Sequence, residues 1–145
     1  MTRNPMPCFG VPMVVLLLAL GACQESSPAA EQAAYAATKP WLAMMDAGEY
    51  ERCWDAAAPW FRDNVPSLDH WLATARETRK PLGTLRSRQL SKTTFKTNPW
   101  GAPSGEYTIV VYDARWEGGD ILETVSMQRQ ADGSWNVVGY HVKEQ

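Results

Sequence analysis

The chain opens on a short apolar run that is followed at once by polar residues. Residues 11–20 read Val-Pro-Met-Val-Val-Leu-Leu-Leu-Ala-Leu, and a polar stretch begins at Gln24. A run of this length is too short to cross a bilayer, which takes about 20 apolar residues. Arg3 before the run and the small residues Gly21 and Ala22 after it complete the pattern of a cleaved secretory signal peptide. We therefore predict a signal peptide over residues 1–22.

The next stretch is polar and rich in alanine, and it contains one proline. We interpret residues 23–34 as a tether that separates the mature N-terminus from a folded domain. Apolar residues at helical spacing then continue to Gly48, a residue that favours a helix end. Pro40 lies inside this stretch, so either the helix kinks there or its rigid part begins near Thr38.

Two further helices are predicted. The first spans residues 49–59. The second begins after Ser67, a favourable N-cap residue, and ends at Pro81 and Gly83. Its apolar face consists of Leu68, Trp71, Leu72 and Ala75. Its last turn is cationic and contains Arg76, Arg79 and Lys80.

The second half of the chain changes to a strand pattern. Strands are predicted over residues 85–96, 106–116, 121–129 and 135–142, separated by turn sequences such as Asp132-Gly133. Helices followed by a meander of strands predict an α+β fold, with the helices packed on one face of a four-stranded antiparallel sheet. We expect a single α+β domain over residues 35–145.

The strand over residues 106–116 is apolar on both of its alternating faces. Ile109 and Val111 lie on one face, and Val110 and Tyr112 on the other. The strands of a sheet with one solvent-exposed face should alternate between apolar and polar residues. We expect the second face to be covered by the tether or by the loop around Trp100; the alternative is that it lines a pocket or meets a partner.

Composition narrows the function classes. The 14 basic and 16 acidic residues are mixed along the chain, which gives no support to nucleic-acid binding. Seven Trp residues predict a core built on large aromatic side chains. Of the three cysteines, Cys8 leaves with the signal peptide and Cys23 starts the mature chain, so Cys53 has no intramolecular disulfide partner. We expect Cys53 to be a small buried apolar residue.

Leu20-Gly21-Ala22-Cys23 resembles the lipobox of bacterial lipoproteins, which is a Leu, a small residue, Gly or Ala, and then Cys. The resemblance implies cleavage between Ala22 and Cys23 and lipidation of Cys23, with a diacylglyceryl group on its sulfur and a fatty acid such as palmitate on its new amine. Two or three acyl chains hold a protein firmly on a membrane. Because Gln24 is not Asp, the family analogy favours the outer membrane over the inner membrane.

No arrangement of side chains predicts catalysis. We expect His70 to face solvent, whereas His141 shares a strand face with Trp135 and Val137 and could be interior. Two histidines so far apart predict no metal site, and no cofactor motif occurs.

Three charged residues have candidate roles in this pattern. We expect Asp46 to bind backbone N–H groups of the turn that follows it. Arg86 and Arg88 share a strand face, where they either hold an anion or lie in solvent opposite Glu123 or Glu106.

From Trp41 onward the chain resembles a bacterial family known as domain of unknown function 4019. The resemblance rests on Trp41-Leu42-Ala43, Asp46-Ala47-Gly48-Glu49-Tyr50, Trp54-Asp55-Ala56-Ala57, Phe61, Trp71, Pro81-Leu82-Gly83, Arg86-Ser87-Arg88, Gly105-Glu106-Tyr107, Glu123-Thr124-Val125, Gly133-Ser134-Trp135 and Val138-Gly139-Tyr140. The order of helices and strands is similar to the cystatin-like or NTF2-like shape. The family implies no activity.

These patterns lead us to expect a lipid-anchored, periplasm-facing envelope protein with a non-catalytic interaction or small-ligand-binding domain. It would attach to the membrane through its N-terminal lipid and could meet a protein partner or a second copy through the second sheet face. The alternatives are a small-pocket enzyme of NTF2-like shape and a dimerisation scaffold. A deep cavity around His141, or an Asp with a raised pKa, would favour the enzyme.

Overall fold

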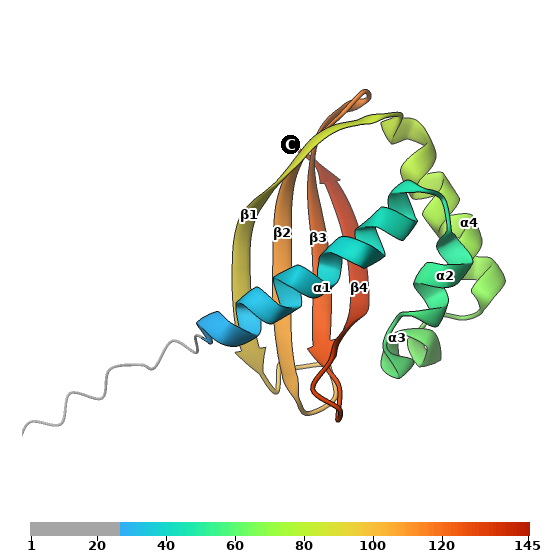
Figure 1. Ribbon diagram of the computed structural model, residues 1–145. Helices are drawn as coiled ribbons and strands as arrows, with labels where there is room; N and C mark the ends of the chain where they lie inside the picture. Colours follow the sequence, from blue (N-terminus) through green and yellow to red (C-terminus); the bar gives the residue numbers. More distant parts are fainter. Residues whose placement is uncertain (1–26) are drawn as a thin grey trace, which may run out of the picture.

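A computed structural model of the chain describes residues 27–145, and it has the predicted α+β architecture (Figure 1). The helical part comes first and the strands follow. The elements are α1 (Pro28–Asp46), α2 (Tyr50–Asp55), α3 (Pro59–Asn64), α4 (Leu68–Arg79), the short 3-10 helix η1 (Lys80–Leu82), β1 (Leu85–Thr97), β2 (Glu106–Trp116), β3 (Gly119–Arg129) and β4 (Trp135–Glu144).

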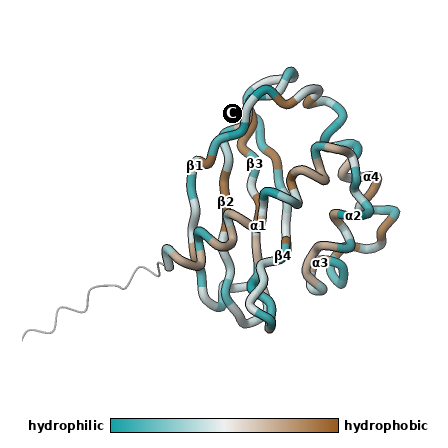
Figure 2. The backbone as a smooth tube through the Cα atoms, in the orientation of Figure 1, coloured by the Kyte–Doolittle hydropathy of each residue, from teal (hydrophilic) through white to brown (hydrophobic). Residues whose placement is uncertain are grey.

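The strands form one antiparallel sheet in the order β1-β2-β3-β4. Helix α1 lies across one face of the sheet, and α2, α3 and α4 are grouped beyond β4 (Figure 1). Edge strand β1 is mostly hydrophilic, whereas β2 carries a hydrophobic stretch (Figure 2). The meander and the helical layer on one face are confirmed.

Helix α1 begins earlier than the sequence pattern predicted. Pro28 occupies its first turn, where a proline costs no hydrogen bond, and Ala34 is completely buried. Residues 28–34 therefore belong to the folded domain rather than to the predicted tether. The helix is continuous through Pro40, and its buried stripe explains why, because packing on the sheet compensates for one lost backbone hydrogen bond. That stripe consists of Ala34, Thr38, Trp41, Leu42 and Met45.

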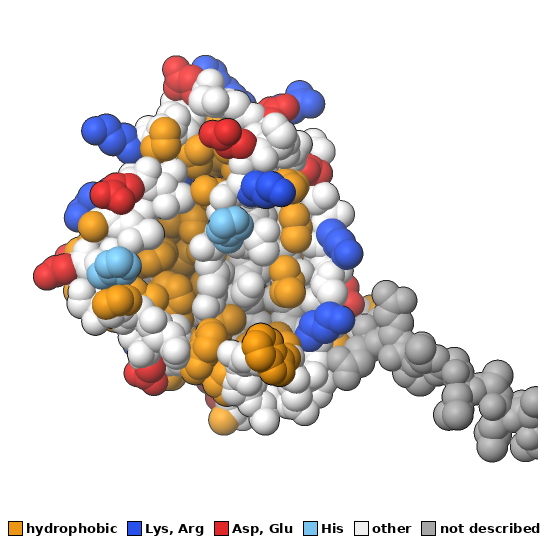
Figure 3. Space-filling model, turned by 180° about the vertical axis from the view of Figure 1, so that it is seen from behind, with side chains coloured by type: hydrophobic (Ala, Val, Ile, Leu, Met, Phe, Trp, Pro, Cys, Tyr) orange, Lys and Arg blue, Asp and Glu red, His pale blue; other side chains and the backbone are white. Residues whose placement is uncertain are grey.

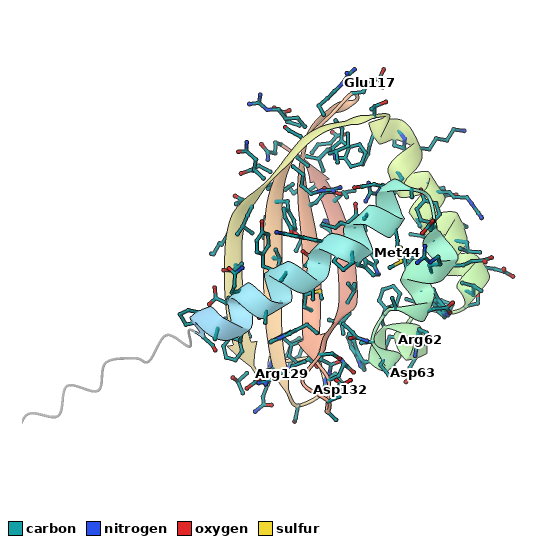
Figure 4. The ribbon with its side chains drawn as sticks, viewed as in Figure 1. Met44, Arg62, Asp63, Glu117, Arg129 and Asp132 are labelled. Atoms are coloured by element: carbon teal, nitrogen blue, oxygen red, sulfur yellow. The ribbon has the colours of Figure 1, made fainter. Side chains whose placement is uncertain are left out.

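The helix predicted over residues 49–59 ends early: α2 stops at Asp55, and a separate short helix, α3, begins at Pro59. The residue before a proline avoids the helical conformation, and Ala58, which precedes Pro59, has an extended backbone with φ −60° and ψ 149°. Its N–H donates to the carbonyl of Val137 on β4 over 2.8 Å. Arg62 on α3 closes the turn by donating to the carbonyls of Asp55 and Ala57 (Figure 4). The hydrogen bond from Ala58 to Val137 thus connects the segment between α2 and α3 to the sheet.

Helix α4 starts as predicted. The side chain of Ser67 accepts a hydrogen bond from the backbone N–H of His70 over 3.1 Å. Trp71, Leu72 and Ala75 are buried on its inner face.

The core between the helices and the sheet is aromatic, as the Trp content predicted. The rings of Trp41 and Trp71 lie 6.2 Å apart, and Phe61 meets Trp71 edge-on at 5.2 Å. Cys53 is completely buried beside them, and burial raises the pKa of its thiol to about 12. The prediction that Cys53 is a small core residue is confirmed. In residues 27–145 we find no helix that is long and apolar enough to cross a membrane.

Candidate functional site

Four charged side chains from four different elements meet at one end of the helix–sheet interface. Asp46 ends α1, Arg79 ends α4, Arg88 lies on β1 and Glu123 lies on β3. Their side chains are 28%, 6%, 12% and 0% exposed, respectively. We call this group the charge cluster, and it is the largest set of interacting ionisable groups that the described residues form.

Glu123 is the centre of the charge cluster. Its carboxylate accepts hydrogen bonds from Nε and Nη2 of Arg88, and from the hydroxyl of Tyr140 over 2.7 Å. Nη2 of Arg79 lies 3.5 Å from the same carboxylate. A buried charge is stable only when partners replace the lost water, and Glu123 has three such partners.

Asp46 forms the outer side of the charge cluster. Its Oδ1 accepts from Nη1 of Arg79 over 2.9 Å and from Nη2 of Arg88 over 2.9 Å, and its Oδ2 accepts from Nη1 of Arg88 over 2.7 Å. The prediction that Asp46 binds backbone N–H groups of the following turn was wrong. Two guanidinium groups from distant elements are stronger partners for a carboxylate than the turn.

Aromatic rings cover the two arginines. The Arg79 guanidinium carbon lies 4.8 Å from the Trp116 ring centroid and 5.3 Å from that of Tyr140, and the Arg88 carbon lies 5.8 Å from Trp116. Within residues 27–145, Nε of Arg79 has no hydrogen-bond acceptor. The π faces of the two rings therefore supply part of the stabilisation that an acceptor would otherwise give.

The pKa values of Asp46, Arg88 and Tyr140 are all shifted away from neutral pH. Burial alone would raise the pKa of Asp46, but its hydrogen bonds and charge interactions with Arg88 and Arg79 hold the pKa below the usual value. Burial would lower the pKa of Arg88, yet Asp46 and Glu123 raise it. Burial raises the pKa of the Tyr140 hydroxyl far above its usual range, and Glu123 raises it further. Such groups are poorly suited to transfer protons near pH 7.

The lowered pKa of Asp46 predicts an acid-dependent loss of stability. Because the folded-state pKa lies below the unfolded value of about 4, the stabilisation by Asp46 is complete above that pH and is lost as the pH falls through the folded-state pKa. We expect Asp46→Asn to lower the free energy of unfolding by about 2 kcal/mol at pH 7. The difference from wild type should shrink as urea unfolding is repeated below about pH 4.

Asp63→Asn is the matched control for this measurement, because Asp63 lies on the surface of α3 (Figure 4). Its difference from wild type at pH 7 should remain small, because substitutions of exposed side chains rarely change stability by more than about 0.5 kcal/mol. An Asp46→Asn difference that stays constant between pH 7 and about pH 2.5 would contradict the lowered pKa of Asp46 in the folded protein.

A cleft of about 550 Å³ opens beside the charge cluster. It lies between the ends of α1 and α4 and the sheet, and Trp116 and Arg79 form part of its wall. The exposed charges at its rim are Arg76, Glu77 and Lys80. With both signs present, the rim selects neither anions nor cations strongly.

The opposite face of the sheet carries a smaller, apolar hollow of about 220 Å³. Tyr107 on β2 is buried there among Ala58, Val138, Trp60 and Ala102. Ala102 belongs to the loop around Trp100, so this loop does cover part of the second face of β2, as expected. The remaining hollow corresponds to the alternative, in which that face lines a pocket. We call it the outer hollow, and its full lining is Trp60, Lys96, Pro99, Ala102, Tyr107, Ile109, Ser126, Val138 and Gly139.

Two β-bulges move predicted side chains to other faces. A register shift between Leu85 and Ser87 separates Arg86, which is exposed, from Arg88, which is in the charge cluster. The prediction that they share a strand face was wrong, because a one-residue shift reverses the faces.

A second shift, at the pairing of Ser126 and Met127 with β4, places His141 on the exposed face. His141 is therefore not interior, and it lies apart from the charge cluster. His70 is exposed, as predicted.

The sequence pattern offered Glu123 as a partner of Arg88 in solvent, but it did not predict that the pair is buried or that Arg79 joins it. The predicted lipidation and cleavage residues, Ala22 and Cys23, lie outside the described residues. Within residues 27–145, no group of three or more His, Cys, Asp or Glu side chains could hold a metal ion.

The comparison with known protein families gives one match. It covers residues 37–140, which include all four members of the charge cluster and the outer hollow. No curated protein and no solved structure matches the chain. The chain belongs to the family described as "Protein of unknown function (DUF4019)".

Proposed function

We propose that this chain is a lipid-anchored protein of the bacterial cell envelope whose folded domain makes non-catalytic contacts on the periplasmic side. The observation that carries the proposal is the lipobox-like sequence from Leu20 to Cys23, which ends five residues before α1 begins at Pro28. The first helix of the folded domain therefore begins five residues after the cysteine that would be acylated. Gln24 at the following position favours the outer membrane.

The charge cluster supports a non-catalytic role. Its two carboxylates are each paired with two arginines, and the neighbouring Tyr140 donates a hydrogen bond to the carboxylate of Glu123. The pKa of Asp46 is lowered rather than raised, and His141 faces solvent. A general acid or base needs a pKa near the working pH and access to a substrate. The cluster is better suited to fastening the helices to the sheet.

The outer hollow supports a contact role for the second sheet face. A hollow with a mainly apolar lining has few hydrogen-bonding groups that could orient a polar substrate, but it accepts apolar groups. Two of its lining residues, Pro99 and Ala102, lie on either side of Trp100 in the sequence, and Trp100 is the most exposed large hydrophobic residue among residues 27–145. An exposed aromatic side chain next to an apolar hollow is typical of a contact surface.

Labelling with palmitate and fractionation of cells test the anchor. We expect wild type to carry the label and to sediment with membranes, and Cys23→Ala to lose the label and move to the soluble fraction, because the acyl chains supply the membrane affinity. Cys8→Ala is the matched control and should behave as wild type, since Cys8 precedes the predicted cleavage site. Unlabelled wild type in the soluble fraction, or a mature protein that still starts at Met1, would refute the proposal.

A further inference from the structure

We propose that the β1–β2 hairpin loop, residues 98–105, rests on the surface of the membrane that holds the anchor, with Trp100 in the headgroup layer. This inference rests on the proposed lipidation of Cys23. It adds a second, non-covalent membrane contact and fixes which end of the domain faces the lipid.

Trp100 is the side chain that makes this contact. Its exposure of 101% means that no part of the indole packs on the domain. Exposing a whole indole to water costs free energy that a partner can recover. Tryptophan prefers the membrane–water interface, where its ring is among lipids and its N–H reaches polar groups. Pro99 and Ala102 extend the apolar surface on either side, and both line the outer hollow.

The loop holds Trp100 in place. The backbone N–H of Asn98 donates to the carbonyl of Gly105 over 2.8 Å, and the Asn98 side chain accepts from the Gly105 N–H over 2.7 Å. The hydroxyl of Tyr107 donates to the carbonyl of Pro103 over 2.8 Å. A loop that is ordered before binding loses little conformational entropy on contact. The loop backbone that carries Trp100 is thus ordered before contact.

The start of α1, which follows Cys23 by five residues in the sequence, lies at the same end of the domain as the loop (Figure 1). Cys23 precedes Pro28 by five residues, and five residues span about 18 Å at most. The first turn of α1 lies against β1, because the hydroxyl of Thr93 donates to the carboxylate of Glu31. From Thr93, β1 runs on to Thr97, where the loop begins (Figure 1). The acyl chains therefore hold the loop end of the sheet, and not the far end, close to the bilayer.

The charges around the loop are compatible with a lipid surface. Lys96 is exposed and lines the outer hollow, and a cation near an anionic bilayer contributes about 1 kcal/mol of attraction. The nearby carboxylate of Glu106 is paired with Arg129 over 2.8 Å, so it adds little repulsion. Seen from behind, hydrophobic side chains gather at the lower end of the molecule, with Lys or Arg colour on one side of them and Asp or Glu colour on the other (Figure 3).

Fluorescence quenching in vesicles tests the contact. The full acylated protein is reconstituted into vesicles of phosphatidylglycerol and brominated phosphatidylcholine, whose bromine atoms quench indoles within the bilayer. We expect Trp100→Phe to reduce the quenched fraction by at least about twofold, because Trp100 is the indole placed in the lipid. Trp54→Phe is the matched control and should leave the fraction unchanged, since Trp54 on α2 packs on Phe61.

The other outcomes separate the two proposals. An acylated protein, verified by intact mass, in which Trp100→Phe leaves the quenching unchanged would overturn the membrane contact and leave the anchor standing. A chain without acyl groups would overturn both. A Cys23→Ala variant that sediments as a dimer and shields Trp100 from acrylamide would show that Trp100 contacts a second copy of this chain instead of a lipid surface.

Discussion

Replacement of Glu123 by alanine is expected to lower the free energy of unfolding by about 3–5 kcal/mol. The variant removes the acceptor for two nitrogens of Arg88 and for the hydroxyl of Tyr140. It also leaves two buried guanidinium groups facing a single carboxylate, that of Asp46. An uncompensated buried charge costs more than the ion pair itself contributes. Urea unfolding followed by tryptophan fluorescence measures the loss.

Glu106→Ala is the matched control, because it also removes one glutamate from an arginine pair in the sheet. The side chains of Glu106 and Arg129 are 39% and 49% exposed, and exposed pairs of this kind contribute about 1 kcal/mol or less. If both variants lost less than about 1 kcal/mol, water would have to reach Arg79 and Arg88 freely, and the charge cluster would not be a buried network.

The charge cluster also determines how the helices and the sheet come together. Asp46, Arg79, Arg88 and Glu123 come from α1, α4, β1 and β3. Apolar surfaces tolerate small shifts in packing, whereas buried charges are neutralised only when all four elements meet in one register. The cluster therefore favours a single docking of the helical layer, and this explains why a domain would keep charges at an otherwise aromatic interface.

The sheet could be predicted closely from the sequence. Strand β2 has the predicted bounds, and the other strands differ by one or two residues at an end. The pattern was informative because β-branched and aromatic residues alternate with turn sequences such as Asp132-Gly133. The burial of Arg79 could also have been predicted from the sequence. It follows Leu72 by seven positions and Ala75 by four, a spacing that places all three on one helical face.

The bulges and the long-range contact at the helix break could not be predicted in the same way. The exposure of His141 depends on one extra residue in the pairing of β3 with β4, which no local residue preference specifies. Pro59 is a local signal for the break, because it disfavours a helical conformation at Ala58, but the bond from Ala58 to Val137 joins residues that are far apart in the sequence. Tertiary contacts decide both features, and they also decide which carboxylate meets which arginine.

Trp41→Ala is expected to be comparably damaging, with a loss of about 3–5 kcal/mol in the free energy of unfolding. Trp41 is 3% exposed, and its indole N–H donates to the carbonyl of Cys53 over 3.1 Å. Its ring lies 6.2 Å from that of Trp71 and 5.4 Å from that of Tyr140. The side chain thus joins α1 to α2, α4 and β4, so its removal leaves a cavity where all four elements meet.

Trp100→Ala is the matched control, since it makes the same chemical change at a fully exposed indole. Its stability in urea should stay within about 0.5 kcal/mol of wild type. The two tryptophans therefore separate the two roles of aromatic residues in this domain. Loss of Trp41 should unfold the protein at lower urea without a specific effect on lipid contact, whereas loss of Trp100 should change lipid contact at unchanged stability. A Trp41→Ala variant as stable as wild type would show that the helical layer does not depend on this junction.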